Sequence, residues 1–138
     1  MTTTMPLALE IVTPEERVVT VACEEVRLTS VDGQFGIRPG HTPLVAALAA
    51  GELVYVAGGA THRYAAGEGF AEVSNDRVRV LVEEAHRAEE LDPQTAAQEL
   101  QERQKALASL KPGDPAYEQE RANVERAAAR ALVARGGR

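Results

Sequence analysis

Hydrophobic and polar residues alternate along most of the chain between Leu7 and Val82. The alternating runs are short, and Gly, Pro, Asn or Asp residues interrupt them. The clearest runs are residues 7–12, 18–23, 25–29, 53–56, 61–65, 70–73 and 77–82. A period of two over such lengths, with turn residues between the runs, is typical of antiparallel strands. The pattern predicts an all-β sandwich or barrel of about ten short antiparallel strands.

Several of these predicted strands are apolar at consecutive positions and so have no polar face. Examples are Val18 and Val19, residues 54–56, and residues 80–82. Two interpretations remain open. Such strands can lie centrally or at a corner between sheets, or a partner can cover one outer face of the sandwich.

The pattern changes after Val82, where residues 83–90 are rich in charge and form the expected junction. Asp92 before Pro93 is a typical helix start, and Asp114 before Pro115 repeats it. Residues 111–113, Lys-Pro-Gly, should end the first helix. The sequence therefore predicts an antiparallel hairpin of two helices, residues 93–110 and 115–134. The expected domains are residues 1–88, the sandwich, and residues 89–138, the hairpin.

The apolar seam of this hairpin is thin. The predicted contact positions are Ala96, Leu100, Leu107 and Leu110 in the first helix, and Tyr117, Val124, Ala128 and Ala131 or Leu132 in the second. So few apolar side chains barely offset the entropy of ordering two helices. We expect the hairpin to depend on the surface against which it docks, as a movable element does.

Composition and charge narrow the range of partners. The net charge of −6 argues against binding nucleic acid, because phosphate contacts need a basic face. Cys23 is the only cysteine and lies in a predicted strand, so we interpret it as a small buried hydrophobe in a protein of the reducing cytoplasm. No run of residues is apolar enough for direct membrane insertion, and no signal segment is evident.

The sequence contains no convincing active site or metal site. It has no phosphate-binding loop, no nucleophile elbow and no His-x-His or His-Glu-x-x-His pattern. A small metal-dependent β-domain enzyme is the catalytic alternative. The paired glutamates at residues 15–16, 24–25, 83–84 and 89–90 are interpreted as solvated surface. The second predicted helix is net positive, with Arg126 and Arg130 on one face. It is either a solvated face or a surface that docks on acidic groups.

The segment from Gly36 to Leu44 predicts a rigid turn. Pro39 fixes φ near −65°, and Gly40 offers the positive φ of a type II turn, with His41 and Pro43 following. With its surroundings, this segment resembles the epsilon subunit of F-type ATP synthases. The similarity includes Asp32-Gly33-Gln34-Phe35-Gly36-Ile37, Pro39-Gly40-His41-Thr42-Pro43-Leu44, Leu9-Glu10-Ile11-Val12-Thr13-Pro14-Glu15 and Glu68-Gly69-Phe70-Ala71-Glu72-Val73. In the last string Glu68 replaces a family glycine.

The resemblance implies a sandwich followed by a helical hairpin and a non-catalytic central-stalk (rotor) subunit. In that family the sandwich binds the gamma subunit and the c-ring, and the extended hairpin reaches the alpha and beta subunits and inhibits ATP hydrolysis. The expected location is peripheral, on the cytoplasmic face of the bacterial cell membrane. The alternative is a free-standing β-sandwich scaffold whose hairpin recruits another partner.

The resemblance also implies site residues. Asp32, Gly33, Gln34, Phe35 and Gly36 would form the loop that faces the c-ring, with Gln34 where many members have Glu. Some members bind ATP at the hairpin through a motif that contains an arginine, and this chain has Thr95 at that position. We therefore expect no cofactor and only weak regulatory ATP binding. Its candidate residues are Asp92, Arg121 and Arg126. Arg126, Arg130 and Arg135 are the candidate contacts of the inhibitory helix with an acidic surface.

Overall fold

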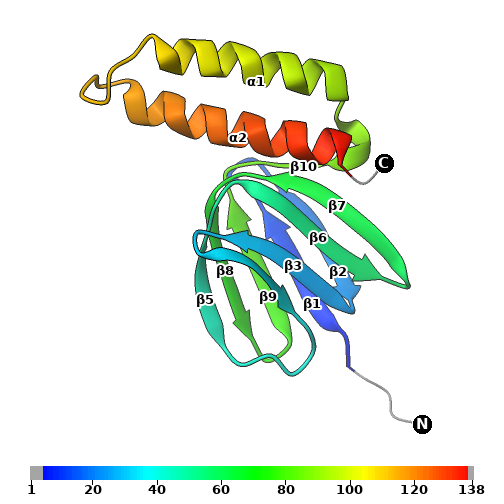
Figure 1. Ribbon diagram of the computed structural model, residues 1–138. Helices are drawn as coiled ribbons and strands as arrows, with labels where there is room; N and C mark the ends of the chain where they lie inside the picture. Colours follow the sequence, from blue (N-terminus) through cyan, green and yellow to red (C-terminus); the bar gives the residue numbers. More distant parts are fainter. Residues whose placement is uncertain (1–4, 137–138) are drawn as a thin grey trace.

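The computed structural model describes residues 5–136, which form ten strands and two α-helices (Figure 1). The strands are β1 (Leu7–Val12), β2 (Arg17–Cys23), β3 (Glu25–Ser30), β4 (Gly33–Ile37), β5 (Leu44–Leu48), β6 (Gly51–Ala57), β7 (Ala60–Ala66), β8 (Gly69–Ser74), β9 (Arg77–Val82) and β10 (Ala85–Arg87). A 3₁₀ turn, η1 (Ala88–Glu90), leads into α1 (Pro93–Ala108) and α2 (Tyr117–Arg135). The predicted all-β domain with a helical hairpin is confirmed.

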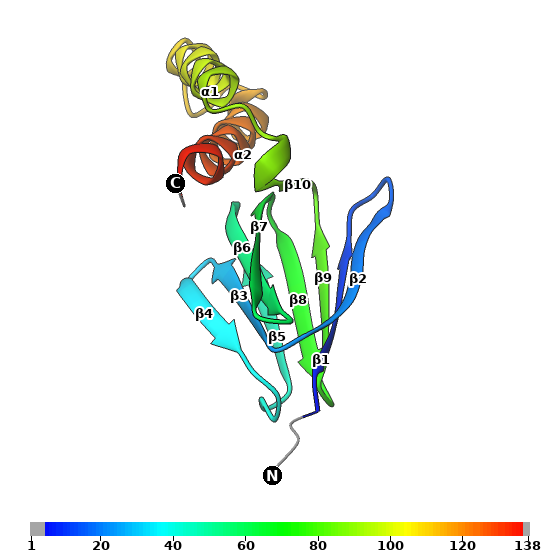
Figure 2. The same ribbon diagram turned by 90° about the vertical axis from the view of Figure 1, so that its right-hand side faces the viewer.

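The strands follow the order β10-β7-β6-β3-β5-β8-β9-β1-β2, and β4 pairs with β3. A single residue pair, Ser30 with Leu48, joins β3 to β5, so the sheet folds there into two layers (Figure 2). One detail departs from the predicted antiparallel pattern. β1 runs parallel to β9, with Leu9 beside Val78 and Ile11 beside Val80. Residues far apart in the sequence therefore meet at the centre of one layer.

The alternating apolar residues fill the space between the two layers. The largest fully buried side chains include Leu7, Leu9, Ile11, Val26, Leu28, Ile37, Leu53, Val73, Val78 and Val80. Cys23 is buried as predicted, and burial raises the pKa of its thiol. It therefore packs as a small hydrophobe.

The hairpin of this same chain covers one of the apolar outer faces. On β6 and β7, Val54 and Arg63 are cross-strand neighbours on the face away from the core, and α2 contacts both strands. Val54 is buried there, although the core already encloses Leu53 and Tyr55 on the opposite face. Neither interpretation of the strands that are apolar on both faces included a helix of the same chain, which is what covers the outer face of β6.

The starts of the two helices are not alike. In α1, Asp92 accepts hydrogen bonds from the backbone N–H of Thr95 at 2.8 Å and from its hydroxyl at 2.7 Å, as expected of an N-cap. Asp114 does not repeat this role. Its carboxylate accepts from the backbone N–H of Lys111 and closes the turn between the helices, and α2 begins three residues later, at Tyr117.

The hairpin is stacked on one end of the sandwich, with α2 between α1 and the strands (Figures 1 and 2). Ala96 of α1 packs on Ala131 and Ala134 of α2, with Leu100 at the edge of this cluster. Ala128 and Leu132, both predicted at the seam, are exposed. The buried residues of α2 are alanines and Val133. Small side chains suit this helix because it packs against α1 on one side and against the sandwich on another. No helix within residues 5–136 is long and apolar enough to cross a membrane.

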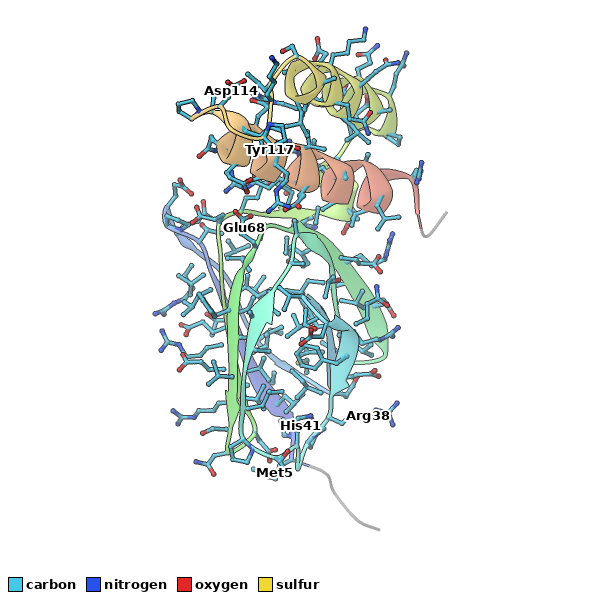
Figure 3. All side chains as sticks on the ribbon, turned by 60° about the vertical axis from the view of Figure 1, so that its left-hand side comes forward. Met5, Arg38, His41, Glu68, Asp114 and Tyr117 are labelled. Carbon is cyan, nitrogen blue, oxygen red and sulfur yellow. The ribbon has the colours of Figure 1, made fainter. Side chains whose placement is uncertain are left out.

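The predicted rigid turn lies at the end of the sandwich away from the hairpin, where Figure 3 labels Arg38 and His41. Gly40 has φ +88°, and the backbone N–H of His41 donates to the carbonyl of Arg38, which confirms the type II turn. The N–H of Gly40 donates to Asp76 in the turn between β8 and β9 at 2.7 Å. The turn is thus fixed to a second loop at the same end.

The segment predicted as a loop at residues 32–36 is mostly strand. Gly33 to Ile37 form β4, which pairs with β3. Gln34 is exposed, whereas Phe35 packs partly against the core. Val31 and Asp32 form the tight turn between β3 and β4. The backbone N–H of Val31 donates to the carbonyl of Ala47 in β5, and the Ser30 hydroxyl donates to the carbonyl of Gly33 across the turn.

Candidate functional site

The interface between α2 and the sandwich is the most distinctive site of the molecule. Its apolar part is small. Ala65 of β7, Ala88 of η1 and Val133 of α2 form one cluster with Leu91 beside it, and Val54 of β6 is buried under the hairpin. All the buried residues of α2 lie between Ala127 and Ala134, so the docked part is the C-terminal half of the helix. A few alanine, valine and leucine side chains bury little apolar surface. Polar contacts must therefore contribute much of the attachment.

The first polar contact joins Arg126 of α2 to Glu68, which lies between β7 and β8. Two nitrogens of the guanidinium donate to the two carboxylate oxygens at 3.0 and 2.6 Å. This bidentate arrangement is the strongest form of an arginine–carboxylate pair. The hydrogen bonds from Arg126 hold the pKa of Glu68 below its ordinary value, and burial opposes them only in part. Figure 3 shows Glu68 on the sandwich, at the boundary with the hairpin.

The second contact is centred on Glu84, just before β10. Its carboxylate accepts a hydrogen bond from Arg130 of α2 and lies 3.3 Å from Nε2 of His86. Burial alone would raise the pKa of Glu84, but His86 and Arg130 outweigh burial and the pKa is lowered. The Glu84 contact raises the pKa of His86, against burial and the charge of Arg130. Arg130 also lies 3.7 Å from Glu99 of α1.

The third contact holds the end of α2. Arg63 of β7 forms an ion pair with Glu52 of β6 and donates to the carbonyl oxygens of Val133 and Gly136. The last carbonyls of a helix lack partners within the helix and attract cations. A fixed arginine on the sandwich therefore supplies the donors that the helix end needs.

These contacts change the interpretation of several predicted residues. Glu84 was predicted to be solvated surface, but it is half-buried between the imidazole of His86 and the guanidinium of Arg130. Arg126 and Arg130 contact carboxylates of their own chain in this structure. Arg135 is exposed in the last turn of α2. The net positive charge of this helix in an acidic protein indicated that it docks on acidic groups. The sequence could not show which groups, because the carboxylates that Arg130 and Arg126 contact lie 46 and 58 residues away.

The predicted ATP candidates do not converge on one site. A hollow at the base of the hairpin is lined by residues that include His86, Glu90, Asp92, Thr95, Glu99 and Arg130. Asp92 lies there, but Arg121 pairs with Glu118 on α2 and Arg126 is held by Glu68. Three carboxylates face one guanidinium in this hollow, which disfavours a triphosphate. Within residues 5–136 no cluster of three potential metal ligands occurs.

An exposed apolar stripe lies on the outer face of β5 and β8. The side chain of Val45 is 70% exposed and that of Phe70 is 56% exposed. Ala47 is the cross-strand neighbour of Phe70 on the same face. Pro14 and Leu81 line a shallow groove that continues from Phe70 toward β1. Val45 lies on this face as well, opposite Glu72 of β8. Exposed apolar side chains gathered on one face mark a surface that suits a protein partner.

Comparison with known families shows a consistent match. Residues 6–88 match the family described as "ATP synthase, Delta/Epsilon chain, beta-sandwich domain". An ATP synthase epsilon chain of Anaeromyxobacter sp. (strain K) is 45% identical over 130 residues, which cover 94% of this chain and 98% of that protein. The epsilon chain of Geotalea uraniireducens (strain Rf4) is 41% identical over 128 residues, 93% of each chain.

Solved structures resemble this fold as well. A chain in the Euglena gracilis mitochondrial ATP synthase structure, "OSCP/F1/c-ring in rotational state 1", superposes with a TM-score of 0.75 at 24% identity, covering 91% of this chain and 79% of that chain. A chain in the Tetrahymena thermophila mitochondrial ATP synthase "central stalk/cring" structure gives 0.54 at 11% identity, covering 64% and 72%. At these identities the likeness concerns the fold.

Proposed function

The chain belongs to the ATP synthase epsilon-chain family, and we propose that its sandwich attaches to the rotor while its hairpin regulates ATP hydrolysis. It is a non-catalytic stalk subunit of the ATP synthase complex. The observation that carries the regulatory part is the interface of α2, in which a few small apolar residues are supplemented by ion pairs. An element attached in this way can detach without unfolding the sandwich.

The apolar stripe on β5 and β8 is the proposed contact with the gamma subunit. Ala47 and Phe70 are cross-strand neighbours on this face, and Val45 lies on the same face of β5, opposite Glu72. The hairpin packs on β6 and β7 instead. The stripe therefore stays accessible whether the hairpin is docked or released. Burial of one aromatic and two aliphatic side chains is typical of the centre of a protein interface.

The proposed contact with the c-ring is the end of the sandwich away from the hairpin, together with β4. The type II turn at Pro39 and Gly40 is fixed there by Asp76. A rigid turn loses little entropy on binding. Gln34 is exposed on β4 and can donate or accept a hydrogen bond, but it brings no charge to this contact.

For the hairpin we propose two positions. In the docked position seen here, α2 lies on the sandwich and cannot reach another subunit with its Arg126 and Arg130 side chains. Released, the hairpin would present these arginines, with Arg135, to acidic surfaces of the alpha and beta subunits and inhibit hydrolysis. The complex would then place this chain peripherally on the cytoplasmic face of the membrane.

Regulatory ATP binding at the hairpin is proposed to be weak. Thr95 donates to Asp92 and offers no positive charge, and Arg126 is committed to Glu68. A nucleotide would have to displace an internal carboxylate from each guanidinium that it uses. Carboxylates of the chain itself therefore already bind the guanidinium groups that a phosphate would need.

A pull-down on variants of the stripe tests the rotor assignment. Replacing Val45 and Phe70 by Ser should reduce recovery of the gamma subunit at least tenfold, since both side chains would leave the proposed interface. Leu132→Ser is the matched control, because Leu132 is an exposed apolar residue on α2 outside the stripe. Full recovery of gamma by the double variant would overturn this placement. Failure of the natural chain to recover gamma would favour the free-standing scaffold.

A further inference from the structure

Glu84 serves two cations that belong to different parts of the molecule. His86 is in β10, which pairs with β7 and so belongs to the sandwich. Arg130 is in α2 and belongs to the hairpin. Both contact the same oxygen, Oε2 of Glu84. One carboxylate oxygen cannot bind two charged donors as well as it binds one.

We propose that His86 and Arg130 compete for Glu84, so that protonation of His86 weakens docking of the hairpin and deprotonation strengthens it. This inference deepens the proposed function and rests on the proposed mobility of the hairpin. It makes the position of the hairpin sensitive to pH near neutrality. The residues concerned are Glu84, His86 and Arg130.

The charges around His86 fall into two groups according to whether they move. Those expected to stay with the sandwich are Glu15 and Glu16 between β1 and β2, Glu84, Arg87 of β10 and Glu90 of η1. Those that leave with the hairpin are Asp92, Glu99 of α1 and Arg130. Glu99 lies farther from Arg130 than Glu84 does. Of the groups that leave with the hairpin, Arg130 is the one among the main influences on the pKa of His86, and it shares the Glu84 oxygen with His86.

The sign of the effect follows from comparing the docked and released states. In the docked state, Glu84 raises the pKa of His86, while burial and Arg130 oppose this rise. Release removes the charge of Arg130 and the part of the burial that the hairpin supplies, while Glu84 stays beside His86, so the pKa of His86 rises further. The released state therefore binds the proton more tightly, and docking weakens as pH falls through the interval between the two values. Above that interval His86 is neutral in both states and pH has no effect.

The other groups of the interface do not titrate in the same range. The pKa values of Glu68 and Glu84 are lowered from an ordinary value of 4.5, so both carboxylates stay ionised above pH 6. Arginines stay protonated throughout. A change in docking between pH 6 and 8.5 therefore reports the protonation of His86 and not that of the carboxylates or arginines in the ion pairs.

Energy transfer between two labels on the full-length chain measures docking directly. Cysteines at exposed positions, Gln101→Cys on α1 and Ser74→Cys at the end of β8, take the labels once Cys23 has been replaced by Ala. We expect the ratio of docked to released molecules to fall about three- to tenfold from pH 8 to pH 6, because the released state holds the proton of His86 more tightly. High salt should release the hairpin at every pH.

Two substitutions of His86 should act in opposite ways. His86→Gln cannot gain a proton, so it should keep the hairpin docked and remove the pH response. His86→Lys carries a permanent charge beside Glu84, so it should favour release at every pH. His41→Gln is the matched control, since His41 lies at the opposite end of the sandwich, and it should respond as the natural chain does.

Three results would overturn the proposal. They are a pH response that survives in His86→Gln, a natural chain that responds to salt but not to pH, and loss of the response in His41→Gln. If neither salt nor pH moves the hairpin, the proposed mobility is wrong as well, and the regulatory function falls with it. Release by salt alone would leave the regulatory function standing.

Discussion

At the scale of single residues, Glu68 separates the role of its backbone from that of its side chain. Its carbonyl accepts from the backbone N–H of Glu83 and extends the β8–β9 ladder, while its carboxylate binds Arg126. The following residue, Gly69, has no room for a Cβ against the backbone of Leu81. A substitution at residue 68 should therefore change the contact with Arg126 without disturbing the pairing of β8 with β9.

A double-mutant cycle on this pair should detect its share of docking. Glu68→Gln and Arg126→Gln should each lower the docked fraction, and the double variant should be less affected than the sum predicts. We expect a coupling of about 1 kcal/mol at low salt, near the upper end for partly exposed ion pairs. Energy transfer between α1 and the sandwich measures it. Arg103→Gln is the control, because Arg103 pairs with Glu120 inside the hairpin; a coupling near zero would contradict the assigned role of Glu68.

Thr95 offers a second test at this scale. Thr95→Arg should strengthen ATP binding by at least tenfold, because it adds a guanidinium to a hollow in which carboxylates outnumber arginines. The N-cap should survive, since the backbone N–H of residue 95 still donates to Asp92. Calorimetry with ATP measures the change. Tight binding by the natural chain would show that the internal carboxylates do not exclude phosphate.

At the scale of elements, α2 shows what the residue pattern could and could not predict. Its existence was predicted from Asp114 before Pro115 and from apolar residues at helical spacing, and Asp92 correctly marked the start of α1. Ala131 was predicted at the seam and is buried, but Ala127 and Ala129 were missed, because alanines give no hydrophobic signal of their own. Asp114 was misassigned because a carboxylate before a proline serves a turn as well as it serves a helix.

Removal of both helices tests the division of the chain into two elements of different function. A stop codon after Glu90 should leave a folded sandwich, since the core between the layers contains no residue of α1 or α2. The truncated chain should still join the rotor, while inhibition of ATP hydrolysis is lost. Circular dichroism and hydrolysis by the reconstituted complex report the two effects. An unfolded product would show that the hairpin supports the sandwich more than its small interface suggests.

At the scale of the whole molecule, the fold was predictable and the arrangement of its parts was not. The period of two and the turn residues define strands locally, so the sandwich could be predicted from short stretches of sequence. The parallel pairing of β1 with β9 and the contacts of Arg126 and Arg130 join distant residues. Nothing in a local pattern indicates which of several carboxylates an arginine will meet.

Replacing Arg126, Arg130 and Arg135 by Glu should affect the two positions of the hairpin differently. Docking should weaken, because Glu68 and Glu84 would then face like charges. Inhibition of hydrolysis should also weaken, more at low salt than at high salt, if the released helix binds acidic surfaces. Arg135→Glu alone separates the two effects, since Arg135 is exposed and pairs with no sandwich carboxylate in the described chain. If inhibition increases in the triple variant, the arginines serve only to dock the hairpin on the sandwich and do not bind the acidic surfaces of other subunits.

The position of β1 between β2 and β9 has a consequence for how the chain folds during synthesis. β1 and β2 are close in sequence and can pair early, but Leu9 meets Val78 only after most of the sandwich has been made. Closing so long a loop is slow and entropically unfavourable. A nascent chain that ends before β9 therefore exposes one edge of β1, which other chains or chaperones can engage. Synthesis through Val82 removes that edge, and the hairpin emerges only after the surface on which it docks is complete.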